Sequence, residues 1–428
     1  MSKRFIASFS DSQIGMPMAG LRSPGSLRLV RDVSKIGKGT ALDTIAGIYP
    51  FTVPVSSNDP ITIQDSSIDW TPGSALIFLF GVINGSDNAL CSVGATDGTD
   101  EWVSTNMSFD NSTTSSTASQ SKTGACLLAF TTGEAQFSQW LAGGLELAVT
   151  DQFISAVSGF AVFFHEDWSA KCGTFDPHNT QDQSISVSGL GHFPELVFAS
   201  VSPFGFSSAL GSDYRYSFGA WQPNGNQYAY VMRDVDGVSP TQVDAILHSD
   251  RVGAESPTGT EFQFSTPIGG GFDCTTRAGN ASSNTRIGYL SLGGLGARVH
   301  VGEFTAATST GISDYLNSGF KPHLGMINSG VVTATDTVFT DARAEVCTIS
   351  GFSTLSASNC TFYSENGETA SSSNSLYDTR PYKSVFPDGG FLQNFASLSG
   401  FVPGGYRLNY SLVQDTTARK GFEVTIGI

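Results

Sequence analysis

The chain has 428 residues, only 14% of them charged, and it contains 48 glycines and 31 phenylalanines. At about 100 to 200 residues per domain, this length allows two to four domains. The net charge of −16 argues against general nucleic-acid binding, which requires a surface of clustered Lys and Arg. Low charge and abundant Gly, Ser and Thr favour short strands joined by tight turns over long solvated helices.

Residues 1–46 are predicted to form an extended N-terminal arm. Within residues 1–40, seven basic residues stand against two acidic ones, a balance of +5 that leaves −21 for the remainder. The basic residues, which we predict to dock on a partner, are Lys3, Arg4, Arg22, Arg28, Arg31, Lys35 and Lys38. A separated basic segment is attracted to an acidic partner that repels the acidic body. A poorly ordered leader without function is the alternative.

The N-terminal segment also bears on localisation. It lacks the apolar core of a signal peptide, and no run of about 18 apolar residues occurs in the chain. We therefore expect synthesis in a cytoplasm and no membrane insertion.

An internal repeat organises the rest of the chain. Three apolar runs each follow a proline, and these prolines, Pro72, Pro194 and Pro322, are spaced 122 and 128 residues apart. Each run is continuous rather than alternating, which predicts a central strand covered on both faces. A proline at the start of such a strand costs no ladder hydrogen bond.

Further landmarks keep the same order in each copy. A diglycine opens a strand at Gly143-Gly144, Gly270-Gly271 and Gly404-Gly405, and a Gly-aromatic pair opens the next at Gly159-Phe160, Gly288-Tyr289 and Gly421-Phe422. A third motif begins the later copies at Gly173-Thr174-Phe175 and Gly302-Glu303-Phe304, with Gly47-Ile48-Tyr49 as a weak counterpart. The joint spacing indicates a tandem repeat of about 125 residues.

The predicted fold is all-β, with three tandem β-sandwich (jelly-roll-like) domains behind the arm. Their predicted bounds are 47–170, 171–298 and 299–428. The short junctions between them favour close packing over a string of separate domains.

Two sequence patterns predict which residues are exposed to solvent. Phe422–Ile426 alternates between apolar and polar residues, which predicts a strand with one wet face, whereas Phe160–Phe164 is apolar throughout. The Ser/Thr-rich stretches 111–119 and 364–373 are predicted to be surface loops, where binding would take place.

The sequence carries no common catalytic or metal-binding signature. The common hydrolase, P-loop and zincin motifs do not occur, so we expect no enzyme activity, no cofactor and no metal site. The six cysteines have no C-x-x-C spacing and are predicted to be buried, reduced side chains. Asp97–Glu101 and Asp234–Gly237 could offer Ca²⁺ hard oxygens, but solvated turns are the favoured interpretation. Gly293–Gly296 is interpreted as a turn that ends a strand.

The junction between the second and third copies carries a resemblance. Tyr289–Gly294, then Gly302–Gly311, then Gly319-Phe320-Lys321-Pro322 resembles the repeated β-domains of virion proteins in tailed bacteriophages. The resemblance implies a component of the virus particle and carries over no catalytic residue.

Three functional hypotheses follow. The first is a virion protein exposed as a tail fibre or adhesion component, with its arm on other virion proteins, its loops on a host surface glycan, and a homo-oligomeric state. The second is a capsid decoration protein or head fibre. The third is a polysaccharide-binding or glycan-degrading protein, which as an enzyme needs paired carboxylates in a cleft.

Overall fold

The computed structural model describes residues 46–427, except for 56–57, 67, 84–87, 110–115, 131, 224, 236–242, 266–269, 342–343, 354–355, 366–373 and 387–391. Every regular element in this part is a β-strand, so the predicted all-β fold class is confirmed. None of the described residues belongs to a helix that could span a membrane. The predicted docking residues of the arm, from Lys3 to Lys38, lie outside the described residues.

Each repeat contributes one large antiparallel sheet, and the strand order is the same in all three. The first runs β1 (Ala46–Val53), β10 (Val157–His165), β3 (Pro72–Ile83), β4 (Asn88–Thr96), β5 (Glu101–Phe109) and β6 (Ser116–Thr123). The second runs β11 (Ser169–Phe175), β21 (Arg286–Gly293), β13 (Pro194–Ser202), β15 (Tyr214–Trp221), β16 (Gln227–Asp234) and β17 (Val243–Ser249). The third runs β22 (Arg298–Thr305), β32 (Lys420–Gly427), β24 (Leu324–Gly330), β26 (Ala344–Ser353), β27 (Ala357–Glu365) and β28 (Asn374–Asp378).

Each repeat also has a small four-stranded sheet, again in a common order. The first consists of β2 (Ile61–Gln64), β9 (Gly144–Asp151), β8 (Glu134–Leu141) and β7 (Leu127–Leu128). The second consists of β12 (Ser184–Val187), β20 (Phe272–Arg277), β19 (Glu261–Ser265) and β18 (Gly253–Ala254). The third consists of β23 (Gly311–Tyr315), β31 (Gly405–Val413), β30 (Leu392–Val402) and β29 (Tyr382–Phe386).

The proline-led strands are buried on both faces, as their continuous apolar runs predict. In β3, Ala75 and Ile77 belong to the apolar core between the two sheets of the first repeat. Leu76 and Phe78 point the other way, into a core shared by all three repeats. Alternate side chains of a strand project to opposite faces, so a strand between two cores needs an apolar residue at every position.

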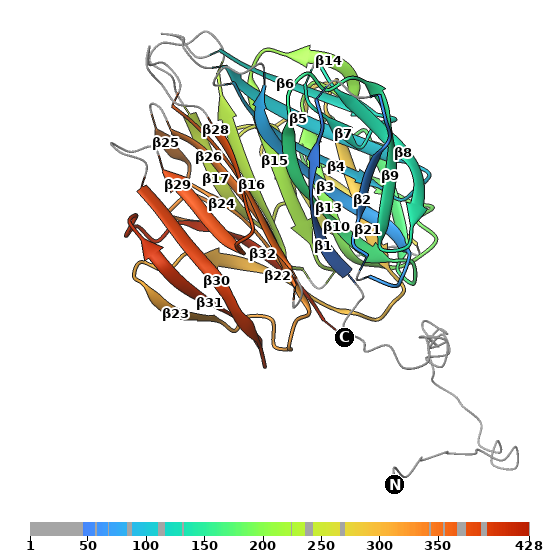
Figure 1. Cartoon of the computed structure of the whole chain (residues 1–428). Helices are drawn as coiled ribbons and strands as arrows, with labels where there is room; N and C mark the ends of the chain where they lie inside the picture. The colour runs from blue at the N-terminus through green and yellow to red at the C-terminus, as the bar shows by residue number, and fades with distance from the viewer. Residues whose placement is uncertain are drawn as a thin grey trace, which may run out of the picture. The chain divides into compact units, whose positions relative to one another are not determined.

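The shared core, which we call the common core, is where the three large sheets meet. Phe218 of β15 lies at its centre, with ring centroids 5.6 Å from Phe78, 6.0 Å from Phe198 and 6.2 Å from Phe422. These rings come from the first, second and third repeats respectively. The expectation of close packing between the repeats is therefore confirmed (Figure 1).

Two large sheets gain a seventh strand from the following repeat. β14 (Ser207–Gly211) of the second repeat pairs with β6, and β25 (Phe339–Asp341) of the third pairs with β17. Figure 1 shows β14 beside β6 at one edge of the first sheet. The third large sheet has no such added strand among the residues described.

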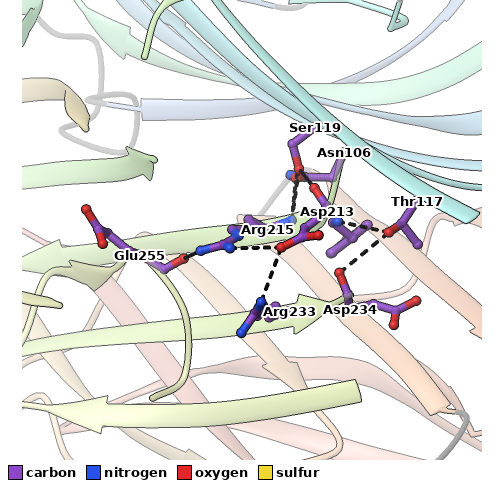
Figure 2. A network of polar contacts seen from close by, with 9 residues as sticks. Asn106, Thr117, Ser119, Asp213, Arg215, Arg233, Asp234 and Glu255 are labelled. Atoms are coloured by element: carbon purple, nitrogen blue, oxygen red, sulfur yellow. Dashed lines mark hydrogen bonds and ion pairs between the residues drawn. The ribbon is translucent and has the colours of Figure 1, made fainter. Parts of the chain in front are cut away.

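A polar network joins the first and second repeats (Figure 2). The hydroxyl oxygen of Ser119 lies 2.6 Å from both the Asn106 Oδ1 atom and the Asp213 carbonyl oxygen, which share its single proton. The Asp213 carboxylate accepts from Arg215 at 2.8 Å and from Arg233 at 3.3 Å. Ser119 is buried, and so is Thr117.

These contacts correct one prediction. The second half of the stretch 111–119, expected to be a surface loop, belongs to β6, where Thr117 and Ser119 are buried. Small hydroxyl side chains fit between closely packed sheets when a partner satisfies each hydroxyl. Residues 111–115 and most of the second stretch, 366–373, lie outside the described residues.

Equivalent positions in the repeats follow from strand pairing. The residue two places after the repeat proline is Ser74, Leu196 or Leu324. These residues pair with Phe164, Leu292 and Ile426 respectively. Four residues before these lie Phe160, Gly288 and Phe422, on the side of the common core. The Gly-aromatic pair of the second repeat is therefore displaced by one residue, and Tyr289 faces its own sandwich core.

Trp102 of the first repeat fills the space that the displaced aromatic residue leaves. A Cβ atom at Gly288 would lie 2.7 Å from the Trp102 indole and 2.9 Å from the Phe206 ring. The indole nitrogen donates to the Tyr289 carbonyl at 2.9 Å. Glycine at this position therefore lets the first repeat insert a side chain into the second.

Candidate binding cleft

An open cleft of about 550 Å³ lies where β22 and β23, the edge strands of the two sheets of the third repeat, stand next to each other. The second repeat supplies one wall through Asn226 and Tyr228, at the start of β16. The remaining lining residues are His300, Gly302, Glu303, Thr305, Asp314, Tyr315 and Asn317. The cleft thus opens into the gap between two sheets at the border of two repeats.

A buried carboxyl group lies behind the floor of the cleft. Glu423 of β32 is 1% exposed and pairs with Gly302 across the sheet. Its carboxyl group accepts hydrogen bonds from the Tyr406 hydroxyl and, at 3.4 Å, from the Asn317 amide. His300 places Nε2 3.7 Å from the Glu423 Oε1 atom, too far for a hydrogen bond.

Gly302 makes room for the histidine. A Cβ atom at this position would lie 2.4 Å from the His300 Nε2 atom. Glycine at this position therefore leaves space for the end of the His300 side chain beside the backbone. The His300 Nε2 atom is buried and has no hydrogen-bond partner.

Burial dominates the ionisation of these two groups. It raises the pKa of Glu423 to about 7, even though the hydrogen bonds from Tyr406 and Asn317 act in the opposite direction. Burial also lowers the pKa of His300. Both shifts favour the neutral form of each group, and at neutral pH the Glu423 carboxyl group is near the midpoint of its titration.

The two lining carboxylates are paired. Glu303 contacts Lys420, with 2.5 Å between Oε1 and Nζ, and accepts from Thr335. Burial raises the pKa of Glu303, but these bonds more than offset it and the net pKa is lowered. Asp314 binds Arg407 at 2.5 and 2.9 Å, and this pairing lowers the pKa of Asp314. The carboxylates stay ionised, and neighbouring cations balance their charge.

The polar floor is peculiar to the third repeat. The positions equivalent to Glu423, three residues before Phe164 and Leu292, are Ala161 and Tyr289. Tyr289 packs in an aromatic cluster, with ring centroids 6.0 Å from Phe175 and 5.6 Å from Phe272. The first two repeats therefore fill this place with Ala161 and Tyr289, and the third fills it with a buried carboxyl group.

The predicted wet face of β32 is wrong. Glu423 and Thr425 are each 1% exposed, because the small sheet covers one face of β32 and the common core covers the other. The alternation does separate two environments, but the polar positions face the sandwich interior. The sequence indicates the polar floor of the cleft only when the repeats are aligned, because Glu423 then stands where the other repeats have Ala161 and Tyr289.

Other candidate residues of the sequence have structural partners. In the Asp97–Glu101 turn, Asp97 accepts from the Thr99 and Asp100 backbone at 2.8 and 2.7 Å, and Lys171 bridges both aspartates. Gly293 ends β21 and Gly294–Gly296 lead the chain away from it, in agreement with the predicted turn at the end of a strand. Five cysteines are buried thiols outside any disulfide bond, as predicted: Cys91, Cys126, Cys172, Cys274 and Cys347. The described residues hold no group of three or more potential metal ligands.

Neither models of protein families nor the curated proteins match this chain. The chemistry of the cleft must therefore be argued from its own residues. Glu423 lies behind the floor at 1% exposure, out of reach of a reacting bond, and both lining carboxylates are held by cations. This arrangement suits hydrogen bonding to a ligand better than proton transfer.

Proposed function

We propose that this protein is a structural component of a tailed-bacteriophage virion, made in the host cytoplasm and exposed on the particle as a tail fibre or adhesion part. Residues 1–46 anchor it to other virion proteins, and the β-sandwich body faces outward. The sequence resemblance at residues 289–322 suggests the particle. The common core supports a structural role, because three sheets buried against one another form a stable platform with a large outer surface.

The charge distribution supports the anchoring role of the arm. Residues 1–40 carry +5 and the remainder −21, so an acidic partner attracts the arm and repels the body. The experiment is deletion of residues 1–45, which stops just before β1. The truncated protein should keep its melting temperature and fail to enter particles.

A variant without the basic charges distinguishes electrostatic attraction by the arm from an effect of the length of the arm. Replacing all seven basic residues of the arm by Gln keeps the segment and removes its charge. We expect incorporation to fall as it does for the deletion. Normal incorporation of the truncated protein would refute anchoring by the arm.

The alternative is a capsid decoration protein or head fibre. The observation that favours it is the arrangement of three similar repeats about one core, which suits a site where three capsid subunits meet. Antibody labelling of intact particles, viewed by electron microscopy, distinguishes the two locations. Label on the tail supports the fibre, and label on the head supports decoration.

Light scattering of the purified protein tests the expected homo-oligomer.

A further inference from the structure

We infer that the cleft between β22 and β23 is a binding site for a neutral carbohydrate. The inference rests on the proposed adhesion function and assigns its ligand class and location. It concerns the third repeat alone, where the open gap between the sheets meets Tyr228 of the second repeat.

The first argument comes from the lining. Asn226 and Asn317 are exposed, and an amide offers both donors and acceptors to a hydroxyl-rich ligand. Tyr228 is half-buried beside the common core and offers an aromatic ring with a polar end. β22 and β23 are edge strands of the described sheets, so backbone groups along the cleft add further hydrogen-bonding positions.

The second argument comes from charge. Glu303 is paired with Lys420, and Asp314 with Arg407, so the two lining carboxylates contribute no net charge with their partners. A free cation would have to displace a bound lysine or arginine, and an anion would meet two carboxylates. A neutral ligand rich in hydroxyl groups fits this surface without either cost.

The third argument comes from the difference between repeats. A carboxyl group is costly to bury, and so is an imidazole nitrogen without a hydrogen bond; the places equivalent to Glu423 in the other repeats hold Tyr289 and Ala161. Departures from a well-packed core concentrate at functional sites. Here the departure lies directly behind the cleft, where Glu423 accepts a hydrogen bond from Asn317 and His300 is a lining residue.

The test uses the full-length protein and a panel of neutral oligosaccharides built from glucose, galactose, mannose and N-acetylglucosamine. Saturation-transfer NMR identifies a bound sugar, and titration calorimetry measures its affinity. Tyr228→Ala and Asn317→Ala should each weaken binding about tenfold. Phe193→Ala is the matched control, because Phe193 is a 61% exposed aromatic residue outside the cleft lining and should leave affinity unchanged.

Tyr228→Phe is a second variant that should fold normally, because it keeps the aromatic ring and removes only the hydroxyl group. The inference would be overturned if no neutral sugar bound at about millimolar concentration. A dissociation constant of about 1 mM corresponds to a binding free energy of only about −4 kcal/mol. Binding that both cleft variants leave intact would also overturn it. Release of shorter sugars would confirm the cleft while contradicting a purely non-enzymatic protein.

The outcome can be separated from the proposed function. Sugar binding by the purified chain does not depend on particle incorporation, and incorporation of a Tyr228→Ala variant does not depend on sugar binding. A protein that binds sugar but enters particles without its arm would refute anchoring alone. A protein that needs its arm but binds no sugar would refute the cleft assignment alone.

Discussion

Glu423 should make the stability of this protein fall as pH rises towards neutrality. Its pKa is raised by burial from the ordinary 4.5 to about 7 in the folded protein. A group with a raised folded-state pKa binds its proton more tightly when folded, so its stabilising effect is complete below the unfolded pKa. That effect is lost as pH rises through the folded pKa.

The size of the effect follows from the difference in pKa. Between about pH 4 and about pH 8, the wild-type protein should lose about 3 kcal/mol of unfolding free energy through this one residue. Glu423→Gln keeps the shape of the side chain and its hydrogen-bonding partners, Tyr406 and Asn317, without a charge to bury. The variant should match the wild type in acid and exceed it in stability at about pH 8.

Urea unfolding at a series of pH values measures this difference. His192 and His248 have pKa values lowered by burial, so their contributions are lost as pH falls and are common to both proteins. Subtracting the variant from the wild type therefore isolates Glu423 together with its interaction with His300, which lies 3.7 Å away. The exposed Glu166→Gln is the control and should track the wild type. Parallel curves for the wild type and Glu423→Gln would refute the reasoning.

Three further predictions concern the contacts between repeats and the buried thiols. Trp102→Phe removes the indole hydrogen bond to Tyr289 and leaves a cavity between repeats, so urea unfolding should show a loss of about 2 to 4 kcal/mol; an unchanged midpoint would count against this contact. Asp213→Ala leaves the Arg215 and Arg233 guanidinium groups without their shared carboxylate and should cost about 2 kcal/mol, with a smaller cost expected for exposed Asp167→Ala. Ellman's reagent should react with five buried thiols only after denaturant has unfolded the protein: Cys91, Cys126, Cys172, Cys274 and Cys347. Rapid reaction of any of these thiols in the folded protein would contradict their burial.

Much of the architecture could be predicted because burial on both faces leaves a local trace. The runs after Pro72, Pro194 and Pro322 are apolar at successive positions, and the strands that begin at or just after these prolines are central in their sheets. Regular spacing of turn residues then revealed the repeat. These features depend on near neighbours in the chain, which sequence patterns record directly.

The remaining features depend on contacts between distant residues. Thr117 and Ser119 look like loop residues, yet partners about 100 positions away, Asp213 and Tyr214, satisfy their hydroxyl groups inside the protein. Glu423 belongs to a strand whose alternation is genuine, but a second covering layer replaces the expected water. Periodicity reports that two faces differ, and it does not report what covers them.

The displaced aromatic of the second repeat has a similar cause. Gly288-Tyr289 matches the motif by spacing, whereas pairing with the proline-led strand places Gly288 where Phe160 and Phe422 stand. A one-residue shift in a strand moves each side chain to the opposite face. Trp102 arrives from another repeat to fill that place, which no local pattern could indicate.

The common core also determines how freely the repeats can diverge. Identical subunits around a threefold axis would bury an acidic residue such as Glu423 three times and meet its desolvation cost three times. Because one chain supplies all three sheets, a costly specialisation is confined to a single repeat while its two neighbours keep apolar cores. Covalent linkage of the repeats thus lets two copies supply stability and a third acquire a separate chemistry.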